Sequence, residues 1–141
     1  MRQLFDIIIK ALLLIWELPQ NFIGAIYFVY LVIVSDTQIC DDGDAIEIYS
    51  DKMSGGISLG IFRAYSAKYF ASDSRYVKIM RMHETGHRKQ SKMLGPLYLI
   101  VIGIPSLAWA TLHSHCRKIS EMDYFAFYTE RWADKLGNVK R

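Results

Sequence analysis

Residues 83–87 of the chain read His-Glu-Thr-Gly-His and match the pattern H-E-x-x-H. In a helix the two histidines lie four residues apart on one face, so both imidazoles can bind one zinc ion. Zinc lowers the pKa of a bound water to about 7, and Glu84 lies beside the first histidine, where it can take the proton of that water as a general base. The pattern therefore indicates zinc-dependent hydrolysis. The alternative is that His83 and His87 are ordinary polar positions of an amphipathic helix.

A catalytic zinc site needs three protein ligands and one open position. Glu130 supplies a carboxylate on a second expected helix, residues 120–136, which begins near Ser120 and ends at Gly137. Asp134 follows Glu130 one turn later on the same face, where it can accept a hydrogen bond from a liganding histidine and fix its tautomer. We expect Glu130 to be the third zinc ligand. The alternative is a solvated helix charge paired with a basic neighbour.

The histidine pattern needs a helix of its own, and the sequence marks both of its ends. Ser74 is an N-cap candidate, and Gly95 followed by Pro96 is a strong stop signal, so we expect a helix over residues 74–94. Gly86 costs about 1 kcal/mol in a helix interior relative to alanine. Its presence predicts that another backbone packs closely against this helix.

Attack on a carbonyl group also requires a hydrogen-bond donor for the developing oxyanion. The sequence does not choose among four candidates for this role: His113, His115, Tyr124 and Tyr128. The two histidines, together with Cys116, also have metal-binding side chains. Polar residues that close an apolar segment at a membrane interface explain this group as well.

A small antiparallel hairpin or sheet is expected within residues 45–70. Apolar residues alternate with others over 46–49 and again over 57–62, with turn residues between them, and a third strand is expected near 65–70. Residues 35–44, which are rich in aspartate and contain Gly43, are expected to form a surface loop. The strand over 57–62 is also a candidate to pair with an extended peptide substrate, the alternative being an ordinary sheet strand.

Residues 1–35 predict a membrane-associated helical segment, because Leu4 to Val34 contains only three charged residues. Pro19 starts a new element. The helix after it, Phe22 to Val34, would rise only about 20 Å, against roughly 30 Å of hydrocarbon. We therefore expect either a helical hairpin that dips into the bilayer or one long kinked helix. The alternative is a pair of buried helices in a soluble core.

A further apolar stretch, residues 97–112, separates the histidines from Glu130 in the chain. Its roughly 24 Å of helix is short for a crossing, and Gly103 with Pro105 marks a place to bend, so we expect a re-entrant or interfacial hairpin. Lysines and arginines lie on both sides of the stretch, which favours a site that faces the cytoplasm.

The 141 residues suit a single domain over residues 1–141, and the formal net charge is +3. The basic residues form no long run that would follow a phosphate backbone, so nucleic acid is not an expected partner. We expect an integral or monotopic membrane protein whose partners are membrane lipid and a peptide or membrane-protein substrate. The sequence makes no prediction of the oligomeric state.

The HETGH pattern with a later E-x-x-x-D helix resembles the gluzincin clan of metallopeptidases. With apolar segments on both sides, it is most similar to the membrane-embedded branch, the CAAX-processing and heat-shock type of zinc peptidase. Residues 83–99 and 128–137 also resemble small uncharacterised bacterial membrane proteins with an HExGH motif. The resemblance implies a mostly helical, membrane-associated zincin-like α+β fold in a bacterial inner membrane, with Zn²⁺ as cofactor. It implies these site residues: ligands His83, His87 and Glu130, general base Glu84 and ligand partner Asp134.

Three functions fit the sequence. The leading prediction is a membrane-embedded zinc metallopeptidase. The second is a non-catalytic membrane protein in which zinc ties two helices together and the protein acts through a protein partner. The third is a membrane scaffold without metal. Only the first predicts that Glu84→Gln keeps zinc and abolishes cleavage.

Overall fold

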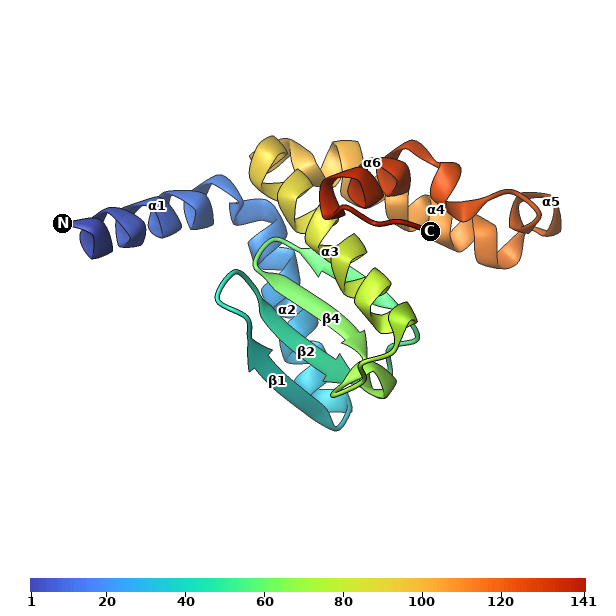
Figure 1. The fold of residues 1–141 in the computed structure, drawn as a ribbon, viewed down its shortest axis with the longest axis horizontal. Helices are drawn as coiled ribbons and strands as arrows, with labels where there is room; N and C mark the ends of the chain where they lie inside the picture. Colours follow the sequence, from blue (N-terminus) through green and yellow to red (C-terminus); the bar gives the residue numbers. More distant parts are fainter.

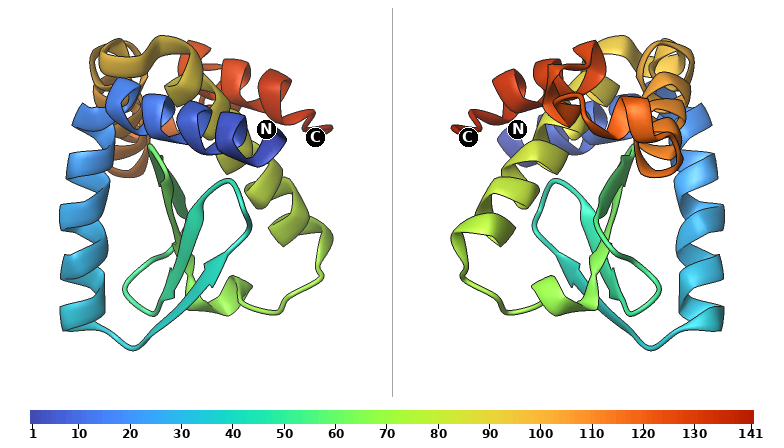
Figure 2. Two further views of the ribbon diagram at one scale, coloured as in Figure 1. Left: turned by 90° about the vertical axis from the view of Figure 1, so that its left-hand side faces the viewer. Right: turned by 90° about the vertical axis from the view of Figure 1, so that its right-hand side faces the viewer.

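A four-stranded sheet lies between helix α2 on one face and helix α3 on the other, as Figure 2 shows. The computed structural model describes residues 1–141, apart from the side chain of Arg2. The α+β class expected from the sequence is confirmed. The helices are α1 (Arg2–Trp16), α2 (Leu18–Val34), α3 (Arg75–Leu94), α4 (Ile104–His115), α5 (Arg117–Ser120) and α6 (Tyr128–Gly137), and the strands are β1 (Thr37–Asp41), β2 (Ile46–Ser50), β3 (Gly56–Leu59) and β4 (Phe62–Ser66).

The sheet is mixed, with strand order β1-β2-β4-β3. The predicted hairpin between β2 and β3 is wrong, because β4 lies between them, parallel to β2 and antiparallel to β3. Residues 62–66 of β4 are mostly buried, which suits a central strand, whereas β3 lies at the edge. Alternation of apolar residues shows which face of a strand is buried, but it does not identify the neighbouring strand.

Two segments around the sheet also differ from the predictions. Residues 37–41, expected within a surface loop, form the edge strand β1 and pair with β2. Most side chains of β1 are exposed, so backbone pairing, which leaves no pattern of apolar residues, holds this strand in place. The third strand begins earlier than expected, at Phe62, and a short 3-10 turn follows it at Ala67–Tyr69.

The two faces of the sheet have different chemistry. Against α2 the core is apolar and includes Leu31, Ile48 and Ala64. Against α3 the buried side chains are charged or aromatic, and they include Arg63, Tyr49 and Tyr65. Arg63 forms ion pairs with Asp42 and Glu47 and also binds the hydroxyl group of a threonine on α3. Buried hydrogen bonds of this kind give α3 a defined position over the sheet.

Helix α3 has the predicted limits. Ser74 is its N-cap, and the hydroxyl oxygen accepts a hydrogen bond from the amide of Val77 at 3.3 Å. The helix ends at Leu94, and Gly95 has a φ of 52°, a conformation that favours glycine. The indole ring of Trp16 packs against this glycine, so a Cβ atom at Gly95 would lie 2.1 Å from the ring.

The apolar stretch after α3 forms one continuous helical segment. A π-helical turn at Leu99–Gly103 leads directly into α4, and within this described stretch the bend expected at Gly103 and Pro105 is absent. Pro105, inside this continuous segment, has no N–H to donate to the carbonyl of Val101 four residues earlier. The hydroxyl of Tyr128 donates to the carbonyl of Val101 at 2.6 Å. The chain therefore reverses at the ends of this segment rather than within it.

Helix α6 brings the chain back against α3. It begins at Tyr128 and not near Ser120 as predicted. The spacing of Ser120 and Asp123 resembles a capping box, but neither residue caps this helix, and Asp123 belongs to the turn before it. Its carboxylate accepts a hydrogen bond from the amide of Phe125 at 3.0 Å and starts a separate 3-10 turn. Phe127, with extended backbone angles, then separates this turn from α6.

Helices α1 and α2 meet at an angle of 83°. Among the described residues no single helix combines the length and apolar character needed to cross a bilayer. Helices α1 and α2 reach that length and apolar character only when they are taken together as a bent pair. Figure 1 shows α1 projecting from the rest of the fold. At the bend, the fully buried Glu17 accepts hydrogen bonds from Arg88 and Ser91 of α3.

Candidate metal centre

The three predicted ligands converge at one point. His83 and His87 come from α3 and Glu130 comes from α6, and all three are buried. The Nε2 atoms of the histidines lie 3.2 Å apart, and the Oε2 atom of Glu130 lies 3.1 Å from His83 and 3.5 Å from His87. Ligand atoms around a tetrahedral zinc, at bond lengths of about 2.1 Å, lie about 3.4 Å apart. The group is therefore the right size to hold a metal ion.

Close packing of α3 against α6 brings the ligands together, and two glycines make it possible. A Cβ atom at Gly86 would lie 1.9 Å from the carbonyl oxygen of Ala133, and one at Gly137 would lie 2.1 Å from that of Met82. The predicted close approach of a backbone at Gly86 is confirmed. Figure 1 shows α6 crossing over α3.

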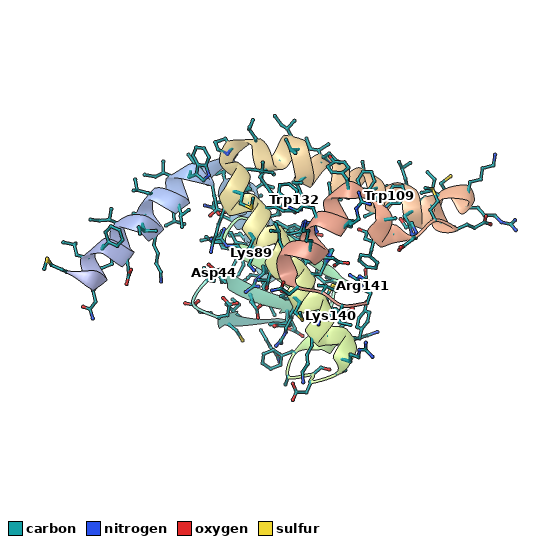
Figure 3. The ribbon with its side chains drawn as sticks, turned by 45° about the horizontal axis from the view of Figure 1, so that its top comes forward. Asp44, Lys89, Trp109, Trp132, Lys140 and Arg141 are labelled. Carbon is teal, nitrogen blue, oxygen red and sulfur yellow. The ribbon has the colours of Figure 1, made fainter. Side chains whose placement is uncertain are left out.

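Each histidine is oriented through its Nδ1 atom. His83 donates from Nδ1 to Asp134 at 2.6 Å, the contact expected for this aspartate. Arg141, labelled in Figure 3, also binds Asp134, at 2.7 Å. His87 donates from Nδ1 to Gln90 at 2.7 Å, and Gln90 in turn donates to a backbone carbonyl of α6. These hydrogen bonds leave both Nε2 atoms facing Glu130.

The carboxylate of Glu130 is also held in place. Its Oε1 atom accepts hydrogen bonds from Ser106 of α4 at 2.6 Å and from Thr129 at 2.8 Å, which leaves Oε2 for the histidines or a metal. The sequence reasoning missed Ser106, Thr129 and Gln90. Gln90 follows His87 by three residues on the same helical face, and Ser106 is a polar residue in an apolar stretch, so both carried a weak signal.

Without metal, the site holds a proton. Burial alone lowers the pKa of His83, but the hydrogen bond to Glu130, the nearby charge of Glu84 and the hydrogen bond to Asp134 outweigh it and raise the pKa to about 9. Burial raises the pKa of Glu130, but hydrogen bonds from both histidines hold it well below its usual range. A metal ion would replace the proton on His83 as the positive charge among these carboxylates.

The ligand group opens onto a cavity of about 430 Å³, which is also lined by Glu84, by β3 and by α4. Burial raises the pKa of Glu84, and its Oε2 atom is buried without a hydrogen-bond partner. Gly56 of β3 lies so close that a Cβ atom there would be 2.6 Å from Oε1 of Glu84. A carboxylate left free beside a ligand group is available to accept a proton from a bound water or substrate.

The four oxyanion candidates occupy different places. Tyr124 lines the cavity, and burial raises its pKa, which keeps the hydroxyl protonated as a donor. The other three do not line the cavity. Tyr128 binds Val101, His113 lies 2.9 Å from the carbonyl of Met122, and His115 is exposed at the end of α4. The cavity therefore contains one of the four.

No family model, curated protein or solved structure matches the chain. The resemblance to gluzincin peptidases therefore stays a prediction. What the geometry supports is a buried group of two histidines and a glutamate that could hold a metal ion, next to a free carboxylate in a cavity.

Proposed function

We propose that the protein is a zinc-dependent peptidase. The observation that carries the proposal is the convergence of His83, His87 and Glu130 on one point, with the unpartnered carboxylate of Glu84 in the same cavity. Two imidazoles and one carboxylate are a ligand set of catalytic zinc sites, which keep one position open. Two histidines held through their Nδ1 atoms support a metal in this place.

When bound, zinc would supply a Lewis acid that polarises the scissile carbonyl and lowers the pKa of a coordinated water to about 7. Glu84 takes the proton of the attacking water and passes it to the leaving amine, and its raised pKa suits this exchange. Tyr124 donates a hydrogen bond to the developing oxyanion. Strand β3, at the edge of the sheet and in the cavity wall, pairs with an extended peptide.

We also propose that the protein is associated with a membrane, in keeping with the bacterial inner membrane expected from the sequence. Large apolar side chains are exposed along α1, along the outer face of α2 and on α4 with the π-helical turn before it, including Phe5, Phe22, Ile33 and Ile100. Apolar surface of this extent is typical of a lipid or protein contact. Lysines and arginines on both sides of α4 support a site on the cytoplasmic side.

The test compares wild-type protein with Glu84→Gln and with His87→Ala. Zinc content and cleavage of a quenched peptide library are measured for each. We expect wild type and Glu84→Gln to bind one zinc ion, His87→Ala to lose it, and only wild type to cleave. Zinc binding without cleavage by wild type would favour the non-catalytic alternative, in which the metal ties α3 to α6. Wild-type protein without stoichiometric zinc would contradict both.

A further inference from the structure

The cavity that contains the ligand group is almost entirely uncharged. Apart from the ligands and Glu84, no Lys, Arg, Asp or Glu side chain of the described residues lines it. Two of its uncharged polar groups already form hydrogen bonds within the protein: the hydroxyl of Ser106 donates to Glu130, and the hydroxyl of Tyr98 donates to the carbonyl of Ser58. Its volume, about 430 Å³, lies in the range of about 300–1,000 Å³ usual for ligand cavities. The walls therefore suit apolar side chains.

The uncharged walls favour an internal segment of a bound peptide over one of its charged ends. A terminal carboxylate or ammonium group would lose its hydration in the cavity and would need a buried counter-ion. Within the described lining no arginine or lysine faces the cavity to hold a carboxylate. The carboxylate of Glu130 is bound by the histidines, and in the proposed reaction that of Glu84 is occupied by proton transfer. A free chain end is therefore a poor occupant, and an internal peptide bond is a good one.

The opening of the cavity lies between α2 and α4. Ile23 of α2 and Ile104 and Leu107 of α4 line the cavity, yet they are 44%, 64% and 64% exposed, so they form its rim. Two neighbouring side chains, Phe22 of α2 and Ile100 of the π-helical turn that leads into α4, are also apolar and exposed. A segment that enters here crosses apolar surface before it reaches the ligand group.

Strand β3 supplies backbone groups along this path. Its pairing with β4 places Ile57 opposite Ala64 and Ser58 opposite Arg63. In an antiparallel pair the peptide groups alternate in direction, so those of Gly56 and Ser58 point away from β4. The hydrogen bond from Tyr98 to the carbonyl of Ser58 agrees with this direction. Because Tyr98 occupies the Ser58 carbonyl, an extended chain would pair with β3 beside Glu84 through the amide of Ser58 and the peptide groups of Gly56.

We infer that the substrate is an internal peptide bond within an apolar, extended segment that reaches the ligand group through the opening between α2 and α4. The inference rests on the proposed peptidase function and specifies its substrate class. The cleavage is a hydrolysis, in which the carbonyl carbon gains a hydroxyl group from water and the leaving nitrogen gains the proton.

The test uses quenched peptides with both ends blocked, in nonionic micelles. One peptide contains only Leu, Ile, Phe and Ala, and matched peptides carry Lys or Asp beside the central bond or have free ends. Cleavage is measured with zinc-loaded wild type. Binding is measured separately by fluorescence anisotropy with zinc-loaded Glu84→Gln. We expect the apolar blocked peptide to be preferred by at least about 10-fold in both measurements.

Two exposed leucines of α4 provide a matched pair of variants. Leu107→Lys places a charge on the rim and should weaken binding and cleavage of the apolar peptide. Leu112→Lys places the same charge on the same helix at a residue that does not line the cavity and is 50% exposed, and should change neither.

Equal processing of charged or free-ended peptides, or equal effects of the two lysines, would overturn the inferred substrate class. Binding of the apolar peptide that depends on Leu107, without cleavage by wild type, would support that class and contradict the peptidase function instead.

Discussion

Gly86→Ala is the sharpest test of how α3 and α6 build the ligand group. The new Cβ atom would lie 1.9 Å from the carbonyl oxygen of Ala133, whereas carbon and oxygen atoms normally approach to about 3.4 Å. The obstacle is backbone and not a flexible side chain, so the helices must separate by about 1.5 Å. Metal sites tolerate errors of only about 0.2 Å in ligand distance. Glu130 would therefore no longer reach a metal held by both histidines.

We expect zinc affinity to fall by more than about 100-fold, because loss of a ligand costs more than the roughly 10- to 100-fold typical of its hydrogen-bonded partners. Affinity is measured by competition with a chromophoric chelator, and folding by circular dichroism. Overpacking should destabilise the fold by about 1–3 kcal/mol, which the better helix propensity of alanine offsets by about 1 kcal/mol.

Gly103→Ala is the matched control, since its Cβ atom would come no closer than 3.3 Å to any neighbour, the nearest being the flexible side chain of Leu99. Unchanged zinc affinity in a folded Gly86→Ala protein would refute the reasoning that close helix packing brings Glu130 to the histidines.

Three further predictions concern single groups. Asp134→Asn should keep the fold but weaken zinc binding by about 10- to 100-fold, because the hydrogen bond that orients His83 loses its charge; an affinity equal to wild type would argue against that role. In metal-free protein with a chelator present, the stabilisation from protonated His83 should be complete below pH 6.5 and lost as pH rises to about 9, a loss of roughly 3 kcal/mol. Urea unfolding between pH 6 and 10 measures this loss, and a flat profile would contradict it. Gly56→Ala should leave zinc content unchanged and lower peptide cleavage, because the new Cβ atom would lie 2.6 Å from Oε1 of Glu84 and displace that carboxylate; full cleavage activity would show that Glu84 need not occupy its observed position.

Local signals in the sequence predicted the helix that carries the histidines. Ser74 and Gly95 act on the backbone of their own neighbourhood, so they could be read without knowledge of the rest of the fold. Gly86 predicted a close backbone contact, because a glycine in a helix interior is costly without one. The spacing of His83 and His87 likewise predicted their shared face.

Long-range relations left weaker signals. The position of β4 between β2 and β3 depends on which strand neighbours which, and alternating residues do not encode that. The spacing of Ser120 and Asp123 predicts a capping box at the start of the last helix, but Asp123 instead caps the 3-10 turn that precedes α6. Ser106 binds Glu130 across 24 residues of sequence, a contact that exists only once α4 and α6 have packed together.

The buried ion pair at the bend between α1 and α2 has a practical consequence for work with this protein. Glu17 is the nearer of two carboxylates around Arg88, which directly follows His87 and is only 3% exposed; the other, that of Asp44, lies 3.8 Å away. Removing the first 17 residues to improve solubility would leave Arg88 with Asp44 alone, a more distant and half-exposed partner, at a cost of up to about 3–5 kcal/mol. Glu17, at the end of α1, thus helps to hold the histidine helix in place, and detergent is a better choice than deletion.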